Sequence, residues 1–376
     1  MTMTAQERLD DVRLLETADP SGMLRQVASS ASQVRTAVRL AAETDLGLLA
    51  QAARPRAIVV TGMGGSGVAG DVLAGVCGPG CPSQIVTVHD YLLPGWVGAA
   101  DLVIAVSCSG STEETLAVAS EAVRRGCPVI GVGGASSPLA LLAQQARAPF
   151  VSVMSAGMPR STLWGLSIPL LVLAERLGVT EGPAEAYESA ALELERMSHL
   201  CRPDSDAFVN PAKILALELA GTLPVIWGTS PLTGVAAYRF ACQLNENAKY
   251  PGVYGVLPEA NHNQVVTFEG PFAPGRGGGG PAFGDQGPQP AVPLRLVVLR
   301  DSQEHPQVAR RREVSVQLAT ERGIGVTELV GQGDLPLERL ASLVQLIDYA
   351  TVYLAIVNGI DPAPVTAIGD LKARIA

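Results

Sequence analysis

The residues best suited to chemistry in this chain lie in one stretch, LNENAKYPGVYGVLPEANHN, at positions 244–263. It combines two carboxylates, Glu246 and Glu259, with Lys249, His262 and four asparagines. A carboxylate and a histidine held in one loop system can move protons on and off carbon and oxygen near neutral pH. The alternative interpretation is a polar helix end and loop whose groups satisfy one another by hydrogen bonds, and the residue types alone fit both.

A glycine-rich loop, GMGGSG at 62–67, follows a short β-rich run at 56–60 and precedes a helix rich in Ala, Val and Leu. A strand, tight loop and helix in this order let backbone N–H groups approach an anion closely. The spacing also matches GxGxxG, and Asp90 stands at the end of the next strand. A dinucleotide-binding site is therefore a second interpretation of this loop. Glycines that only serve a tight turn are the structural alternative.

A hydroxyl-rich loop, SCSGSTEET at 107–115, follows the apolar run at 101–107. Thr112 is placed to cap the next helix, which has glutamates in its first turn. A cap explains one hydroxyl but not four, so the loop favours a phosphate site formed by hydroxyls and free N–H groups. The P-loop pattern GxxxxGK[ST] is absent from this sequence, which argues against a nucleoside triphosphate.

Strand-like and helix-like runs alternate five times between residues 54 and 178, with strands expected at 56–60, 85–89, 101–107, 128–133 and 150–153. This alternation predicts a parallel sheet with helices on both faces. Ligands bind such sheets at the carboxyl ends of the strands, where both loops lie. Arg160 follows the fifth strand and is expected at the same crevice, although a surface ion pair would also explain it.

The rest of the chain predicts a helical segment before the first sheet and a second domain after it. Apolar residues recur at helical spacing over 6–52, and residues 179–190 are expected to form a linker. The second half has expected strands at 223–227, 265–268, 294–299 and 325–330, and Asn210 is placed to cap a helix. We therefore predict an α/β protein with a helical segment at 1–53 and domains at 54–178 and 190–376, each a flavodoxin-like parallel sheet flanked by helices. The glycine-rich run at 270–292 is expected to be a flexible surface insertion.

Composition narrows the class of protein. The chain has 376 residues, 47% of them hydrophobic and 17% charged, which suits two aliphatic cores. No uncharged apolar run reaches the roughly 18 residues of a membrane span, and the charged N-terminus is not that of a signal peptide. A net charge of −9 argues against a nucleic-acid partner, and six scattered cysteines predict reduced thiols in the cytoplasm and no structural zinc.

Taken together, seven motifs resemble one family in type and order. They are GMGGSGVAGD at 62–71, SCSGSTEET at 107–115, PR at 159–160, NPAK at 210–213, LNENAK at 244–249, LPEANHN at 257–263 and the C-terminal DP and LK. The chain resembles the bifunctional phosphoglucose/phosphomannose isomerases, which are built from two sugar-isomerase (SIS) domains. The resemblance covers roughly residues 50–376 and is most specific in the second half.

The resemblance implies isomerisation of glucose 6-phosphate or mannose 6-phosphate to fructose 6-phosphate, without metal or cofactor. Glu246 would move a proton between C1 and C2, Arg160 would stabilise the cis-enediolate, and His262 would assist ring opening. Lys372 matches the family's C-terminal lysine near the sugar ring. In the family the histidine comes from the partner subunit, so a homodimer with His262 donated across its interface is implied. The phosphate is expected at Gly64, Gly65, Ser66, Ser107, Ser109 and Thr112.

Two departures and three alternatives accompany this expectation, and one alternative is an isomerase of a related phosphosugar. The family's serine loop usually reads SYSGNT, so Cys108 and Ser111 replace an aromatic residue and an amide. A phosphosugar sensor without turnover would keep the two anion loops, but the set Arg160, Glu246, His262 and Lys372 argues against it. A nucleotide-dependent oxidoreductase would depend on GxGxxG alone.

Overall fold

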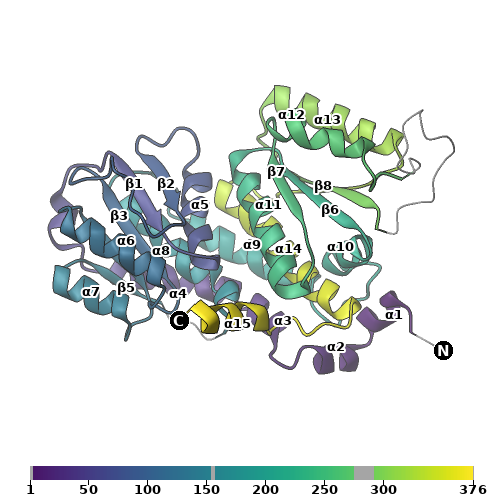
Figure 1. Cartoon of the computed structure of the whole chain (residues 1–376), viewed down its shortest axis with the longest axis horizontal. Coiled ribbons are helices and arrows are strands. Elements are labelled where there is room, and N and C mark those ends of the chain that lie inside the picture. The colour runs from purple at the N-terminus through teal and green to yellow at the C-terminus, as the bar shows by residue number, and fades with distance from the viewer. Residues whose placement is uncertain (1–2, 154–156, 275–291, 376) are drawn as a thin grey trace. The chain divides into compact units, whose positions relative to one another are not determined.

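The structure is a computed structural model that describes residues 3–153, 157–274 and 292–375. The chain forms two compact units. The N-terminal sheet unit comprises residues 28–195 and 335–338, and the C-terminal sheet unit comprises residues 1–27, 196–334 and 339–376 (Figure 1). The N-terminal 27 residues thus pack within the C-terminal sheet unit, although they precede both sheets in the sequence.

The N-terminal sheet unit is built on five parallel strands. Their order across the sheet is β2 (Gln84–Val88), β1 (Ala57–Thr61), β3 (Leu102–Ser107), β4 (Val129–Gly133) and β5 (Phe150–Ser152). Every residue of β1, β3 and β4 is buried, which explains their continuous runs of Val, Ile and Ala. The five predicted strands and their parallel arrangement are confirmed.

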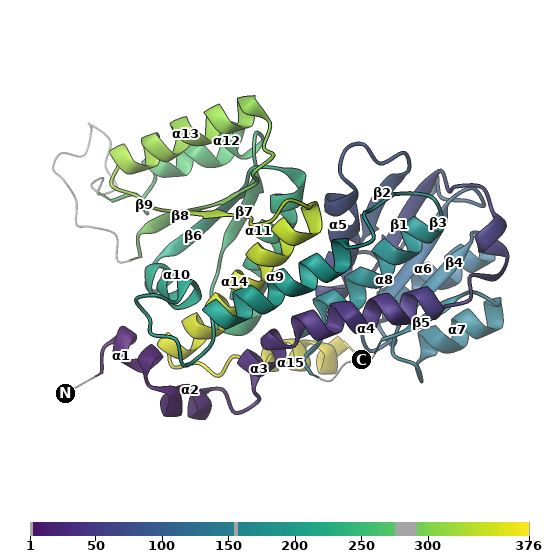
Figure 2. The ribbon, with the colours of Figure 1, turned by 180° about the vertical axis from the view of Figure 1, so that it is seen from behind.

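Helices cover both faces of this sheet, as expected for the flavodoxin-like order (Figures 1 and 2). Helices α5 (Gly65–Cys77) and α8 (Leu163–Arg176) pack together on one face, with α4 (Ser30–Glu43) against α8. Helices α6 (Glu113–Arg124) and α7 (Pro138–Ala146) cover the other face. The unit also contains the short helices η1 (Gly47–Gln51) and η2 (Pro159–Ser161) and most of α9 (Ala186–Leu200), which begins inside the segment expected to be a linker.

The C-terminal sheet unit has four parallel strands, in the order β7 (Val253–Val256), β6 (Leu223–Gly228), β8 (Leu294–Arg300) and β9 (Gly325–Val330). This order repeats that of β2, β1, β3 and β4, so the expected repetition of the architecture is confirmed. The helices and turns of this unit, with α3 and α14 reaching just past its limits, are α1 (Ala5–Asp10), α2 (Val12–Ala18), α3 (Met23–Ala28), α10 (Pro211–Leu219), α11 (Pro231–Gln243), η3 (Leu244–Ala248), α12 (Ala260–Asn263), η4 (Gln264–Glu269), α13 (Pro306–Glu321), α14 (Pro336–Val357) and α15 (Thr366–Ile375).

One prediction about this unit is wrong, and one of its strands was not predicted. The strand expected at 265–268 is wrong, because these residues form the 3₁₀ turns of η4. Its apolar residues cover the core instead, and Phe268 stacks on Trp227 with ring centroids 5.6 Å apart. Strand β7 is absent from the elements predicted above. Of the expected insertion at 270–292, residues 275–291 lie outside the described part of the chain.

Helix α14 is the one helix in the described ranges that is long and apolar enough to cross a membrane, with a mean hydropathy of 1.7 over 18 residues. Of that window, 89% is buried inside the protein. The core helix of a soluble protein has the same length, composition and burial, so α14 is weak evidence for a membrane span.

Candidate active site

The glycine loop joins the end of β1 to the start of α5. Gly64 precedes the helix with a φ of +54°, a backbone conformation that glycine adopts at little cost. Gly65 begins the helix so close to the next loop that a Cβ there would lie 3.5 Å from the Cα of Arg160. Ser66 is buried, and its Oγ accepts a hydrogen bond of 3.2 Å from the N–H of Cys108. The glycine loop therefore contacts both other predicted loops.

The serine loop joins β3 to α6 at the same edge of the sheet. Ser107 is fully buried, and its Oγ lies 2.9 Å from the Oγ1 of Thr112 and accepts a bond from the N–H of Gly110. Thr112 occupies the N-cap position of α6, but its side chain makes no capping bond, so the predicted cap is wrong in this respect. Ser109 is exposed, and the hydroxyl of Ser111 donates to it over 3.0 Å. The first turn of α6 keeps the positive end of its dipole toward this loop.

Arg160 lies in the single 3₁₀ turn η2 that follows β5 and precedes α8. Its side chain is buried, with 4% exposure of the residue, and its backbone adjoins Gly65. The structure therefore brings seven predicted residues to the carboxyl edge of one sheet. They are Gly64, Gly65, Ser66, Ser107, Ser109, Thr112 and Arg160.

Glu246 lies in η3, a π-helical turn that continues α11. Such turns insert one residue into a helix and are common at functional sites. The turn ends at Lys249, which has a φ of +53°. Glu246 itself is partly buried, and its carboxylate is carried by this π-helical turn.

Helix α14 fixes the register of α11 and of this π turn through buried polar contacts. Arg239 donates to Asp348 over 3.0 Å from its Nε, and Gln243 donates to the same carboxylate over 3.1 Å. Asn247, four residues further, donates to the Oγ1 of Thr351 over 3.0 Å. Burial raises the pKa of Asp348, although the charge and hydrogen bonds of Arg239 act in the opposite direction.

His262 and Lys372 lie on two further elements of the C-terminal sheet unit. His262 is on the short helix α12 and Lys372 is on α15, and both residues are exposed. Glu246, His262 and Lys372 are therefore carried by three separate elements. Glu259, the second carboxylate of the stretch, is exposed beside His262 and accepts a bond from Asn263.

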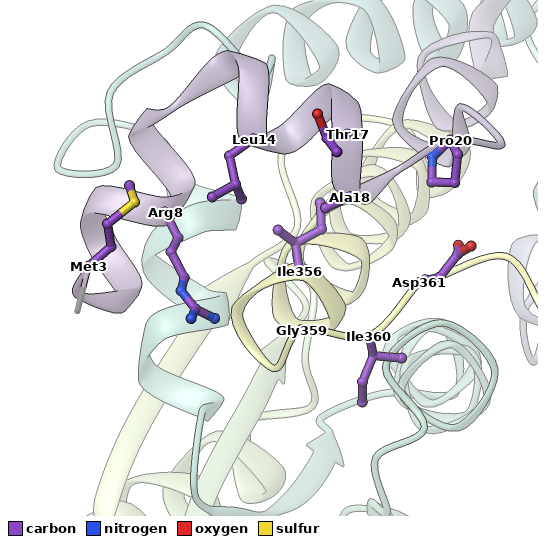
Figure 3. A pocket seen from close by; sticks show the side chains of 10 residues that line it. All are labelled: Met3, Arg8, Leu14, Thr17, Ala18, Pro20, Ile356, Gly359, Ile360 and Asp361. Carbon is purple, nitrogen blue, oxygen red and sulfur yellow. The ribbon is translucent and has the colours of Figure 1, made fainter.

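A cavity of about 540 Å³ lies elsewhere in the C-terminal sheet unit (Figure 3). It is open to solvent and is bounded by α1, α2 and the segment after α14, with Arg8 and Asp361 as its charged residues. None of the predicted site residues lines it. Over the described ranges, no three His, Cys, Asp or Glu side chains come together in a way that could hold a metal ion.

Sequence reasoning gives no role to the residues that hold the Glu246 turn. The signal available for Arg239, Gln243 and Asn247 is their spacing of four, which places three polar side chains on one face of an otherwise apolar helix. Their partners Asp348 and Thr351 lie more than 100 residues away in the sequence. Spacing alone therefore cannot identify these contacts.

The fold is that of a double SIS-type α/β protein, with the glycine loop, the serine loop and Arg160 together at the carboxyl edge of its first sheet. Residues 208–375 match the family described as the bacterial phospho-glucose isomerase C-terminal SIS domain. A bifunctional phosphoglucose/phosphomannose isomerase of Caldicellulosiruptor bescii is 33% identical over 85% of this chain and 89% of its own length. The chain belongs to the family of bifunctional phosphoglucose/phosphomannose isomerases, as its motifs predicted.

Two other relatives add detail. A D-glucosamine-6-phosphate 4-epimerase of Sulfolobus acidocaldarius is 28% identical over 56% of this chain and 63% of its own length. A hypothetical protein from Thermus thermophilus has a solved structure that matches with a TM-score of 0.70 at 16% identity, covering 98% of this chain and 93% of that one. The latter likeness confirms the fold.

Proposed function

We propose that this protein is an aldose–ketose isomerase that interconverts glucose 6-phosphate and mannose 6-phosphate with fructose 6-phosphate. Family membership supports the reaction type, as expected from the motifs. The observation that carries the proposal is the convergence of the glycine loop, the serine loop and Arg160 at one sheet edge. Backbone N–H groups and hydroxyls at two helix N-termini suit a phosphate dianion.

In the proposed binding step, the phosphate replaces the solvent around the exposed Ser109 and Gly64 and accepts bonds from the loop N–H groups and hydroxyls. Ser107 lies within hydrogen-bond distance of Thr112 in the serine loop, and Ser66 accepts a bond from the N–H of Cys108, which supports a pre-formed cradle. Pre-formed donors of this kind lose little conformational entropy on binding.

In the proposed reaction, Glu246 removes the proton from C2 of the open-chain aldose and returns it to C1. The electron pair of the broken C–H bond forms the enediolate double bond, and the C1 carbonyl oxygen takes the negative charge. The proton of the C2 hydroxyl then passes to this oxygen as Glu246 protonates C1, which leaves the carbonyl at C2. Arg160 stabilises this developing charge, which is the larger part of such catalysis. During ring opening, the bond between C1 and the ring oxygen breaks, His262 donates a proton to the ring oxygen, and the C1 hydroxyl loses its proton to solvent as the carbonyl forms. Lys372 holds a sugar hydroxyl.

Glucose and mannose 6-phosphates differ only at C2, and both give the same enediolate. A site that stabilises the enediolate without gripping the C2 hydroxyl serves both substrates. The proposal includes no metal, since Arg160 supplies the positive charge that a metal would otherwise bring.

We further propose a cytoplasmic homodimer in which His262 completes the partner's site. His262 is exposed, and the exposed apolar residues Tyr254 and Val266 precede and follow it in the chain. Tyr254 lies on β7, which is an edge strand. Exposed apolar residues at a sheet edge are typical of an interface.

Turnover of fructose 6-phosphate tests the function, with glucose 6-phosphate and mannose 6-phosphate quantified separately. Both products support the dual isomerase, and one product alone keeps the mechanism but narrows the substrate. Because one relative is named as a 4-epimerase of glucosamine 6-phosphate, that substrate belongs in the same assay. Binding of fructose 6-phosphate without any product would favour the sensor. Inhibition by EDTA that a divalent ion reverses would contradict the metal-free mechanism.

A further inference from the structure

Lysine is rare in this chain, and each lysine stands at a particular place. Of the 27 basic residues, three are lysines (Lys213, Lys249 and Lys372) and the others are arginines. Lys372 is part of the proposed site. Lys213 is buried, donates to the carbonyls of Pro203 and Ser205, and lies 5.7 Å from the ring centre of Tyr353. Lys249 has no role in the proposed reaction.

The ammonium of Lys249 binds four backbone carbonyls from two segments. It lies 2.9 Å from the oxygen of Glu246 and 3.2 Å from that of Asn247, both in the π turn. It also lies 3.1 Å from the oxygens of Asp361 and Pro362, more than 110 residues further along the chain. The bonds to Asn247 and Pro362 are partly buried. One side chain thus joins the turn that carries Glu246 to the segment that leads into α15.

The backbone of Lys249 is shaped for this contact. Its φ of +53° is unfavourable for a residue with a side chain, and such residues occur where the surrounding structure holds them. The left-handed conformation ends the π turn and sends the side chain back over the carbonyls of that turn. The last carbonyls of a helix otherwise lack a partner, and a cation near them also complements the helix dipole.

An ammonium suits this position better than a guanidinium does. Its three protons point in tetrahedral directions, so they can be shared among carbonyls that converge on one point. A guanidinium presents its donors in a planar fork that matches two parallel acceptors. Most basic residues of this chain are arginines, and the convergence of four carbonyls on one point explains why position 249 is a lysine.

We propose that Lys249 is a positioning residue that fixes both the Glu246 turn and the C-terminal segment that carries Lys372. The proposal rests on the proposed function for the roles of Glu246 and Lys372. Lys249 does not touch substrate, and it acts through the backbone carbonyls of Glu246 and Asp361. Because a misplacement of about 1 Å can lower a rate by about 10²-fold, loosening both segments would act mainly on turnover.

The test replaces Lys249 and measures both kinetics and local stability. In Lys249→Met, kcat on fructose 6-phosphate is expected to fall by about 10²-fold, while KM changes by less than about threefold because the phosphate loops are intact. Without substrate, the amides of residues 361–375 and of the π turn are expected to exchange hydrogen faster than in the unmodified protein. Lys249→Gly keeps the left-handed backbone at lower cost, so it tests the ammonium if the methionine variant folds poorly. Lys249→Arg is expected to have less than half of the kcat of the unmodified protein.

Arg147 provides the matched control, because it is the other residue besides glycine with a positive φ, at +54°, in the described ranges. It is basic and exposed and ends α7, away from the proposed site. Arg147→Met is expected to leave kcat and the exchange of residues 361–375 unchanged. Wild-type kcat in Lys249→Met, or unchanged exchange of residues 361–375, would overturn the proposal. If the unmodified protein turns over no phosphosugar, the function fails, and the exchange measurement still decides the positioning by Lys249.

Discussion

In the N-terminal sheet unit, the loops after the adjacent strands β1 and β3 meet through the bond from Cys108 N–H to Ser66, with the hydroxyl of Ser109 exposed beside them. In the C-terminal sheet unit, the equivalent loops after β6 and β8 meet around a carboxylate of the protein itself. Asp301 accepts a bond of 2.7 Å from Ser230, and its N–H donates to Thr229. In the second sheet a carboxylate thus occupies the junction of the two loops, whereas in the first sheet we propose that the substrate phosphate takes the equivalent place.

The two crevices share more than strand order. A Cβ on Gly62, just after β1, would lie 2.9 Å from the carbonyl oxygen of Ser66, and a Cβ on Gly228, at the end of β6, would lie 2.5 Å from the nitrogen of Gly234. Both helices therefore start against the strand end and direct their N-termini into the crevice. Asp301 is in turn paired with the buried Arg339 over 2.9 Å. In the second sheet, the aspartate at the loop junction is therefore tied to helix α14, which carries Arg339.

If the second unit supplies the base and the first supplies the phosphate site, Glu246→Gln should separate proton transfer from binding most strongly. The amide cannot take a proton from carbon, so kcat on fructose 6-phosphate is expected to fall by about 10³-fold or more. Binding of fructose 6-phosphate, measured by calorimetry, should stay within about threefold of the wild-type value. A loss of binding in parallel with activity would contradict the assigned role.

Asp301→Ala should test whether the carboxylate between the loops of the second sheet stabilises the folded protein. Arg339 would remain buried without this partner, and breaking such a pair typically costs about 3 kcal/mol or more of unfolding free energy. Denaturant unfolding measures the loss, and Asp301→Ala combined with Arg339→Met should recover part of it, because both charges are then removed. Equal losses in the single and double variants would show that the pair is not the cause.

The sheets could largely be predicted from the sequence, because their central strands are buried on both faces and are continuous in Val, Ile and Ala. Strand β7 could not, since Val253 and Tyr254 are exposed at an edge and prolines stand at 251 and 258. The run VVTF at 265–268 resembles a strand because a short, mainly apolar run has no distinct period.

For the site, residue types predicted the loops but not the contacts within them. Thr112 stands where a helix cap is expected, yet its hydroxyl lies within hydrogen-bond distance of Ser107 instead. This partner depends on the burial of Ser107 at the end of the strand, which residue type does not reveal. Asp301 gave no signal, because a lone aspartate after a strand is common. The partners of Lys249 are backbone carbonyls, which carry no sequence signature at all.

Ser109 and Ser111 allow a finer test of the proposed phosphate site in the first sheet. They are exposed on one loop and bonded to each other, but only Ser109 is predicted to hold the phosphate. Ser109→Ala is expected to raise KM for fructose 6-phosphate by about tenfold with little change in kcat, as loss of one bond to a charged group does. Ser111→Ala is the matched control and should stay within about threefold. Equal effects of both variants would assign the phosphate contact to the loop as a whole.

The smallest expected effect concerns a second aspartate–arginine pair, at the opposite end of the first sheet. Asp101 precedes β3 and is fully buried, whereas the side chain of its partner Arg56 is 60% exposed. Hydrogen bonds from Arg56 hold the pKa of Asp101 below its ordinary value.

A carboxyl whose pKa is lowered by folding contributes stability above its unfolded pKa, and this contribution is lost as the pH falls through the folded pKa. Arg56→Met should therefore unfold at slightly lower denaturant than wild type at pH 7, and the difference should shrink below about pH 4. The matching comparison is Arg339→Met, which should lose more stability at pH 7, because both side chains of the Arg339–Asp301 pair are buried, whereas the side chain of Arg56 is 60% exposed. A difference for Arg56→Met that grows in acid would reverse the sign and show that the pair stabilises the protonated carboxyl instead.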